Sequence, residues 1–185
     1  MKLEKIIFLD IDGVLNPTHY LNALFKMWKA SEGEIKSQDE FGYYFFPQNC
    51  DSLKRIINET GAKLVISSEW RKMGKEKIMK MWKIRNLPGE VVDITPTEDE
   101  LISEGNFDYL DLIGRGTLIK HWIKKNKFEG KFIIIDDTFD FLDEQVEFLI
   151  ETNGFYGLTN KDAEKAIGIL NGTAISAAHH SESSN

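Results

Sequence analysis

Lys5 to Leu15 read KIIFLDIDGVL, and this stretch decides the fold. The apolar run 6–9 is too short for a helix of ordinary length and is rich in β-forming residues, so it predicts a buried strand. Asp10 and Asp12 follow at the C-terminal end of that strand. Because residues two apart in an extended chain project to the same side, both carboxylates face one pocket, and Gly13 lets the chain turn there.

A pair of carboxylates at the end of an apolar strand indicates a metal site. Two like charges so close raise each other's pKa, and a divalent cation resolves that conflict. A pair of solvated turn aspartates is an alternative that a DxDG motif on its own leaves open. An EF-hand calcium loop is excluded, because that loop needs Gly at its sixth position, where this chain has Leu15, and because it follows a helix.

The composition is typical of a globular protein with one domain. With 185 residues, 42% of them apolar, the chain is long enough for a full core. The net charge of −7 disfavours nucleic-acid binding by broad phosphate neutralisation, although a local basic face could still bind. Cys50 is the only cysteine, which excludes a disulfide framework and a thiolate zinc cluster. No apolar run approaches the length of a membrane span, so we expect a cytoplasmic protein without a membrane partner; the oligomeric state stays open.

Strands and helices are expected to alternate along the chain. Apolar runs predict further buried strands at 62–66, 90–94 and 131–135, and an edge strand at 146–150. Amphipathic patterns predict helices at 20–29, 47–60, 74–85, 114–125 and 160–170. Gly61 is expected to close the second helix, and Asn160 to cap the last one. Leu21, Leu24, Phe25 and Trp28 of the first helix are expected in the core.

The remaining segments predict one domain over 1–171 with a small insertion at about 17–47, which contains a short extended or hairpin segment at 42–47. Residues 98–111 form an acidic loop without clear periodicity, which could close over the site as a mobile flap. The small, polar residues 172–185 are expected to be a disordered tail. The basic residues of helix 74–85 are more often a solvated face than a nucleic-acid groove.

Polar side chains follow three of the predicted strands at the point where each strand ends. They are Asp10 and Asp12, then Ser67 and Ser68, then Asp136 and Asp137, with Arg115 at a helix start before the last pair. In a parallel α/β sheet, ligands bind outside the carboxyl ends of the strands, so these groups are expected to meet. Lys120 remains an alternative to Arg115, and Ser68 to Ser67.

With these four motifs in this order, the chain resembles the haloacid dehalogenase-like (HAD) phosphatase superfamily. Within it, the closest similarity is to the HAD domain of Swiss-army-knife RNA repair proteins, in which several short segments recur. Response-regulator receivers are excluded because their double acid comes on the first strand. The resemblance implies an α/β fold, a Rossmann-like three-layer sandwich with a mostly parallel central sheet and no large cap domain. The recurring segments are Ser67–Arg71, Arg115-Gly116 with Trp122, Asp136-Asp137 and Gly157–Thr159.

The resemblance also implies a role for each site residue. Asp10 would attack phosphorus to form an aspartyl-phosphate, and Asp12 would act as general acid and then general base. Ser67 and Arg115 would bind the phosphoryl oxygens. Substrate contacts are expected from Gly13, Ser68 and Arg71. Mg²⁺ would be held by Asp10, the main-chain carbonyl of Asp12, Asp136 and Asp137.

These expectations lead to two hypotheses. The first is a magnesium-dependent phosphomonoester hydrolase whose partner is a phosphorylated substrate, either a small molecule or a nucleic-acid end. The short insertions would leave its site open, and Lys75, Lys80, Lys83 and Arg85 would guide a phosphate backbone. The alternative is a non-catalytic module of the same fold that binds metal or phosphate.

Overall fold

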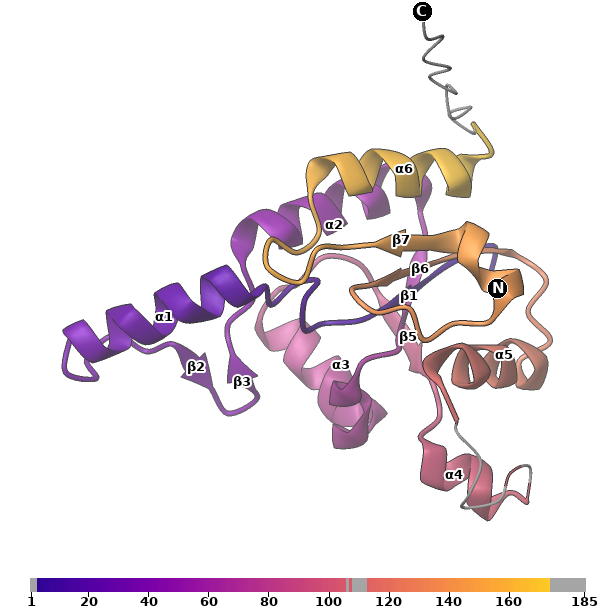
Figure 1. The fold of residues 1–185 in the computed structure, drawn as a ribbon, viewed down its shortest axis with the longest axis horizontal. Coiled ribbons are helices and arrows are strands. Elements are labelled where there is room, and N and C mark those ends of the chain that lie inside the picture. Colours follow the sequence, from indigo (N-terminus) through magenta and orange to yellow (C-terminus); the bar gives the residue numbers. More distant parts are fainter. Residues whose placement is uncertain (1–2, 106, 108–112, 174–185) are drawn as a thin grey trace, which may run out of the picture.

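A five-stranded parallel sheet forms the centre of the protein, in the order β5-β4-β1-β6-β7 (Figure 1). The computed structural model describes residues 3–105, 107 and 113–173. The strands are β1 (Lys5–Leu9), β4 (Lys63–Ile66), β5 (Val91–Ile94), β6 (Lys131–Asp136) and β7 (Leu149–Glu151). The predicted strand that begins the chain is therefore the central one.

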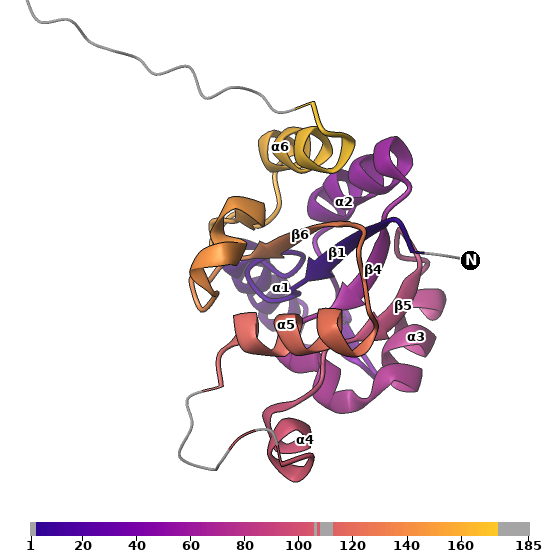
Figure 2. The ribbon, with the colours of Figure 1, turned by 90° about the vertical axis from the view of Figure 1, so that its right-hand side faces the viewer.

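Side chains alternate between the two faces of the sheet, and a separate helix layer covers each face. Ile7 and Leu9 of β1 pack in a core with helices α2 (Pro47–Thr60), α3 (Lys75–Ile84) and α6 (Asn160–Asn171). Ile6 and Phe8 pack on the opposite face with α5 (Arg115–Lys125). Figure 2 shows α2 and α6 on one side of the sheet and α5 on the other. This arrangement confirms the predicted three-layer α/β sandwich.

Helix α2 has the predicted bounds because its ends carry strong local signals. Pro47 occupies the first turn, where its missing N–H leaves no carbonyl unpaired. Gly61 ends the helix in the left-handed conformation, with φ of 68°. The amide of Gly61 then donates to the Ile57 carbonyl over 2.8 Å.

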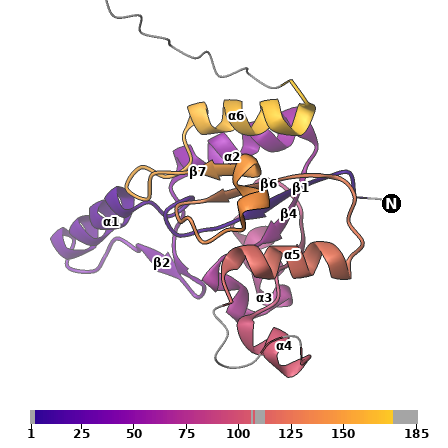
Figure 3. The ribbon, with the colours of Figure 1, turned by 45° about the vertical axis from the view of Figure 1, so that its right-hand side comes forward.

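The insertion after β1 forms helix α1 (Thr18–Ala30) and a hairpin of β2 (Gln38–Asp39) and β3 (Gly42–Tyr43). Both project beyond the sheet (Figure 3). The helix was predicted, but the hairpin lies at 38–43, earlier than the extended or hairpin segment expected at 42–47. The expected burial was also wrong: Phe25 is 55% exposed and Trp28 is 45% exposed, and Leu24 is the buried residue of α1. The reason is that α1 does not pack on the sheet, so its apolar side chains have no inner layer to face.

Three local predictions are corrected. Residues 98–103 are not loop but helix α4 (Glu98–Ser103), because Thr97 and Glu100 form a reciprocal capping box. Residues 143–148 form a 3-10 helix, so β7 begins at Leu149 rather than at Val146. The N-cap of α6 is Thr159, which accepts from the Asp162 amide, and not Asn160.

Parts of two predictions lie outside the described residues. These are the portion of the expected flap at 106 and 108–112, and the expected tail at 174–185. In the described part of the chain, no helix has the length and apolar character needed to cross a membrane.

Candidate active site

The carboxyl ends of β4, β1 and β6 bring three motifs together at one edge of the sheet. The ladder continues past the strand ends, since the Asp10 amide donates to the Ile135 carbonyl over 3.0 Å and the Ser67 amide to the Leu9 carbonyl over 2.9 Å. The order in which the strands are added to the sheet reverses at β1, because the chain builds β4 and β5 on one side of β1 and then β6 and β7 on the other. A reversal of this kind is where open α/β sheets bind ligands.

Asp10, Asp136 and Asp137 form what we call the acidic cluster. Each offers a carboxylate oxygen, and these oxygens lie within 4.8 Å of one another. Asp10 and Asp136 are buried and Asp137 is half-buried. The predicted convergence of the first and last motifs is therefore present.

Two glycines make room for the Asp137 carboxylate. A Cβ added at Gly13 or at Gly154 would overlap its oxygen Oδ2. Gly13 also has a φ of +72°, the left-handed region that side chains disfavour. Gly13 thus shapes the cluster, and its predicted contact with substrate stays a prediction.

Arg115 is the cation of the site. Its Nη1 lies 2.7 Å from Asp10 Oδ2 and 2.6 Å from Asp136 Oδ2. Lys120, the alternative, points elsewhere and pairs with Glu144 over 3.0 Å on the surface. The first turn of α5 therefore supplies the positive charge, as the resemblance implied.

Burial and mutual repulsion perturb the carboxylates of the cluster. Burial, with the charge of Asp10 added, raises the pKa of Asp136 to about 6, although Arg115 and the hydrogen bonds from Thr138 oppose the rise. The same two causes raise the pKa of Asp137. One positive charge from Arg115 does not neutralise three carboxylates, so the cluster favours a further cation.

Asp12 lies beside the acidic cluster, and its side chain is exposed. Its Oδ2 accepts a hydrogen bond from the Trp70 indole N–H over 2.8 Å, and its Oδ1 accepts a longer one of 3.4 Å from Asn16. Partial desolvation and the charge of Asp10 raise the pKa of Asp12, while these two hydrogen bonds and Arg115 lower it. A raised pKa and exposure suit a group that exchanges protons with a bound molecule.

The two serines differ in their partners. Ser67 Oγ is buried and has no hydrogen-bond partner among the described residues. Ser68 Oγ accepts from the Trp70 amide and caps the short 3-10 helix Glu69–Met73. The geometry favours Ser67 over Ser68 as the residue that binds a ligand.

Arg71 is fully buried and its guanidinium is already occupied. It donates to Glu69, to Glu98 at 2.8 Å and to the Pro96 carbonyl at 3.2 Å. These bonds tie the 3-10 helix to the start of α4. The geometry favours a structural role for Arg71 over the predicted substrate contact.

The donor set fits a divalent cation. Oδ1 of Asp10 is buried and, like Ser67 Oγ, lacks a hydrogen-bond partner in the described part of the chain. An unsatisfied buried carboxylate oxygen is costly unless a cation or ligand completes it. Hard oxygen donors of this kind are the ligands that Mg²⁺ prefers.

Sequence reasoning gave no role to two residues of the site. Thr138 donates from its amide and its hydroxyl to Asp136 Oδ1, at 2.9 and 2.8 Å, and so orients that carboxylate. Its position two residues after an aspartate is a signal that local turn patterns could have supplied. The bond from Trp70 to Asp12 joins residues far apart in sequence, which no local pattern reveals.

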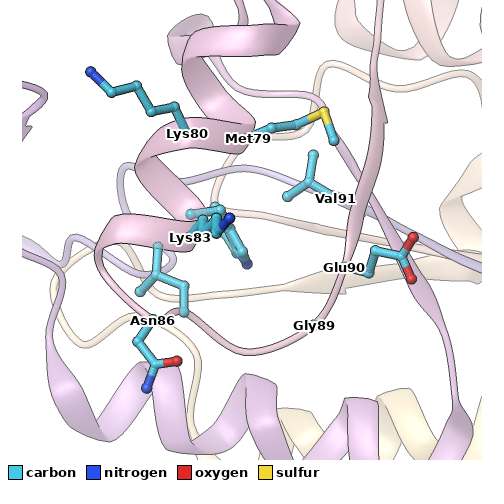
Figure 4. A pocket seen from close by; sticks show the side chains of 9 residues that line it. Met79, Lys80, Lys83, Asn86, Gly89, Glu90 and Val91 are labelled. Atoms are coloured by element: carbon cyan, nitrogen blue, oxygen red, sulfur yellow. The ribbon is translucent and has the colours of Figure 1, made fainter.

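Two of the basic residues of α3, Lys80 and Lys83, lie away from this edge of the sheet. Lys80 and Lys83 border a hollow of about 540 Å³, together with Gly89–Val91 at the start of β5 (Figure 4). The start of a parallel strand is the edge opposite the acidic cluster. The Arg85 side chain is 5% exposed and bonded to Asp39, and Lys75 pairs with Asp93. The contacts of these four residues do not support the expectation that they guide a phosphate backbone into the site.

Comparison with known proteins gave one finding. A family model described as the HAD domain in Swiss Army Knife RNA repair proteins matches residues 6–163. No significant match was found among curated proteins or among solved structures.

Proposed function

The chain belongs to the family of HAD domains found in Swiss Army Knife RNA repair proteins, and from that premise we propose that it is a magnesium-dependent phosphomonoester hydrolase. The observation that carries the proposal is the acidic cluster with Arg115 at its centre and two unsatisfied buried oxygens beside it. A purely structural ion-pair network would be expected to satisfy those oxygens.

In the first step, a carboxylate oxygen of Asp10 attacks phosphorus. The new O–P bond gives an aspartyl-phosphate, and the bond from phosphorus to the leaving oxygen breaks. Asp12 gives its proton to that oxygen. In the second step, water attacks the phosphorus, Asp12 takes the proton of the water, and Asp10 is released together with phosphate.

The other residues place charge where the transferred group needs it. Arg115 bonds Asp10 directly, so it fixes the nucleophile and offers positive charge to the phosphoryl oxygens. Ser67 Oγ, which has no other partner in the described part of the chain, donates to one of those oxygens. Mg²⁺ bound by Asp10, Asp136 and Asp137 would neutralise the remaining negative charge and so let a phosphate dianion approach.

For the substrate, we propose nucleotides or nucleic-acid ends. The family description names RNA repair. Exposed aromatic residues are near the cluster in sequence. Phe139, two residues after Asp137, is 71% exposed, and the exposed Phe155 and Tyr156 follow Gly154, where an added Cβ would overlap the Asp137 carboxylate. Aromatic rings of this kind stack on nucleobases.

Hydrolysis of phosphomonoesters by the purified protein tests the chemistry. Release of phosphate from an aryl phosphate and from a 5′-phosphorylated oligonucleotide is measured with Mg²⁺ and with EDTA. We expect turnover that EDTA abolishes and that Asp10→Asn lowers at least a thousandfold, in line with loss of a nucleophile. Lys120→Met, a change in an exposed ion pair, is the control and keeps the rate. Absence of metal-dependent turnover would leave the metal-binding module as the better account.

A further inference from the structure

Trp70 links the acidic site to the insertion that follows β1. Its indole N–H donates the short hydrogen bond to Asp12 Oδ2, at 2.8 Å. The other bond to the Asp12 side chain, from Asn16, is 3.4 Å long. These are the two hydrogen bonds that the described residues donate to the Asp12 carboxylate. The indole therefore fixes where the carboxyl points.

The hairpin and Phe45, two residues after it, pack against the indole ring. Phe45 packs edge-on against the Trp70 ring, with centroids 5.5 Å apart. Gly42 lies so close that an added Cβ would be 3.3 Å from the ring. Trp70 is thus packed against the insertion on one side and bonded to Asp12 on the other.

Arg85 in turn holds the hairpin. Its guanidinium donates to Asp39 at 2.6 and 2.9 Å and to the carbonyls of Gly42 and Tyr43. It also lies over the rings of Phe45 and Trp70, at 4.8 and 5.9 Å. The contacts form a continuous chain from α3 through the hairpin to Trp70 and Asp12.

We infer that Trp70 is a positioning residue, which holds the Asp12 carboxyl in the orientation from which it protonates the leaving group, and that the hairpin keeps Trp70 in place. The inference rests on the proposed function, since it assigns Trp70 a part in the first step of that reaction. It also gives the insertion a role without requiring it to cover the site.

A misplaced general acid has a specific kinetic signature. A leaving group of low pKa, such as dinitrophenolate, departs without a proton, whereas an alkoxide needs one. The ratio kcat/KM reports the steps up to formation of the aspartyl-phosphate. Loss of Asp12 positioning should therefore lower kcat/KM for an alkyl phosphate much more than for dinitrophenyl phosphate. A general loss of folded protein would lower both equally.

The test compares Trp70→Phe with Trp122→Phe. The first removes the indole N–H and keeps a ring in the hairpin contact. The second removes a similar bond, from the Trp122 indole to Asp93 at 2.7 Å, which involves no residue of the acidic cluster. We expect Trp70→Phe to lose about ten- to a hundredfold in kcat/KM on the alkyl phosphate, with less than threefold loss on dinitrophenyl phosphate. Trp122→Phe should change the two substrates by the same factor.

Each outcome is decisive. The inference is overturned if Trp70→Phe loses kcat/KM equally on both substrates, or loses it on neither. The proposed function still stands in that case, because the wild type is active. A wild type without turnover of either substrate overturns the proposed function and the inference with it. If Trp70→Phe does not fold, Phe45→Leu takes its place: it keeps the indole N–H but removes the ring behind it, and a selective loss on the alkyl phosphate is again expected.

Discussion

Arg115 is the residue on which the charge balance of the site depends. Its guanidinium forms ion pairs with Asp10 and with Asp136, both of which are buried. Buried charges are tolerated when they are paired, and removal of one partner leaves the others uncompensated. The stability of the metal-free protein should therefore be sensitive to this one side chain.

Arg115→Met is expected to lower the free energy of unfolding by about 3 kcal/mol in EDTA at neutral pH. Urea denaturation measures the change. The control is Lys120→Met on the same helix, whose pair with Glu144 is exposed and should contribute less than about 0.5 kcal/mol. Equal effects of the two substitutions would contradict the assigned role of Arg115.

Gly13 should be needed for metal binding as well as for the turn. Gly13→Ala introduces a Cβ that displaces the Asp137 carboxylate, so we expect Mg²⁺ affinity to fall at least about tenfold, as when a ligand or its support is lost. Gly61→Ala is a matched control: its φ is also positive, at 68°, but nothing lies within 4 Å of the added Cβ. Both substitutions should lose about 1 kcal/mol of stability to backbone strain. Isothermal titration calorimetry with Mg²⁺ distinguishes the two variants. A normal Mg²⁺ affinity in Gly13→Ala would contradict the close approach of Gly13 to a metal-binding Asp137 carboxylate.

The raised pKa of Asp136 predicts how metal binding depends on pH. Below its pKa of about 6 the carboxyl is protonated, and an incoming cation must displace that proton. Mg²⁺ affinity should therefore fall about fivefold between pH 6 and pH 5 and level off above pH 7. Calorimetric titrations at these pH values test this, and an affinity that stays constant from pH 5 to 7.5 would contradict it.

At the scale of elements, the N-terminal cap of α6 can be tested by substitution. Thr159 accepts from the Asp162 amide, and the Asp162 side chain reaches back to the Thr159 amide. Thr159→Ala should cost about 1 kcal/mol of stability, whereas Asn160→Ala, one residue inside the helix, should cost less than half of that. Thermal unfolding of the two variants measures the difference; a larger loss in Asn160→Ala would favour the cap predicted from sequence.

Elements with local signals were predictable from the sequence, and elements defined by their neighbours were less so. Helix α2 was predicted to the residue, because Pro47 and Gly61 mark its ends. Helix α1 was also predicted, but the sequence pattern could not tell what its apolar side faces, so Phe25 and Trp28 were wrongly expected in the core. Residues 146–148 have strand-like composition yet lie in a 3-10 helix. The amino-acid composition of this segment does not show at which residue strand β7 begins.

The residues of the candidate active site were likewise predictable in part. Asp10, Asp136, Asp137 and Arg115 follow from the rule that strand ends meet at one edge, and the structure brings them together. The distinction between Ser67 and Ser68 needed hydrogen-bond partners, which adjacent residues in a sequence do not reveal. The link from Trp70 to Asp12 depends on packing of the hairpin, so it could not be predicted from spacing.

At the scale of the whole molecule, the topology explains why so short a chain can build this site. With β1 between β4 and β6, three separate segments deliver their polar ends to one place without a second domain. The insertion projects beside the sheet (Figure 1). An arrangement of this kind would suit the proposed substrate, a nucleic-acid end, because most of that molecule would stay outside the site.

A crystal structure with Mg²⁺ and beryllium fluoride tests the central claim most directly. The account predicts a beryllium fluoride group on the Asp10 carboxylate and a Mg²⁺ ion that takes oxygens from both Asp10 and Asp136, with Arg115 still in contact with Asp10. An ion bound away from these residues, or an Asp10 that stays unmodified beside an occupied metal site, would contradict it.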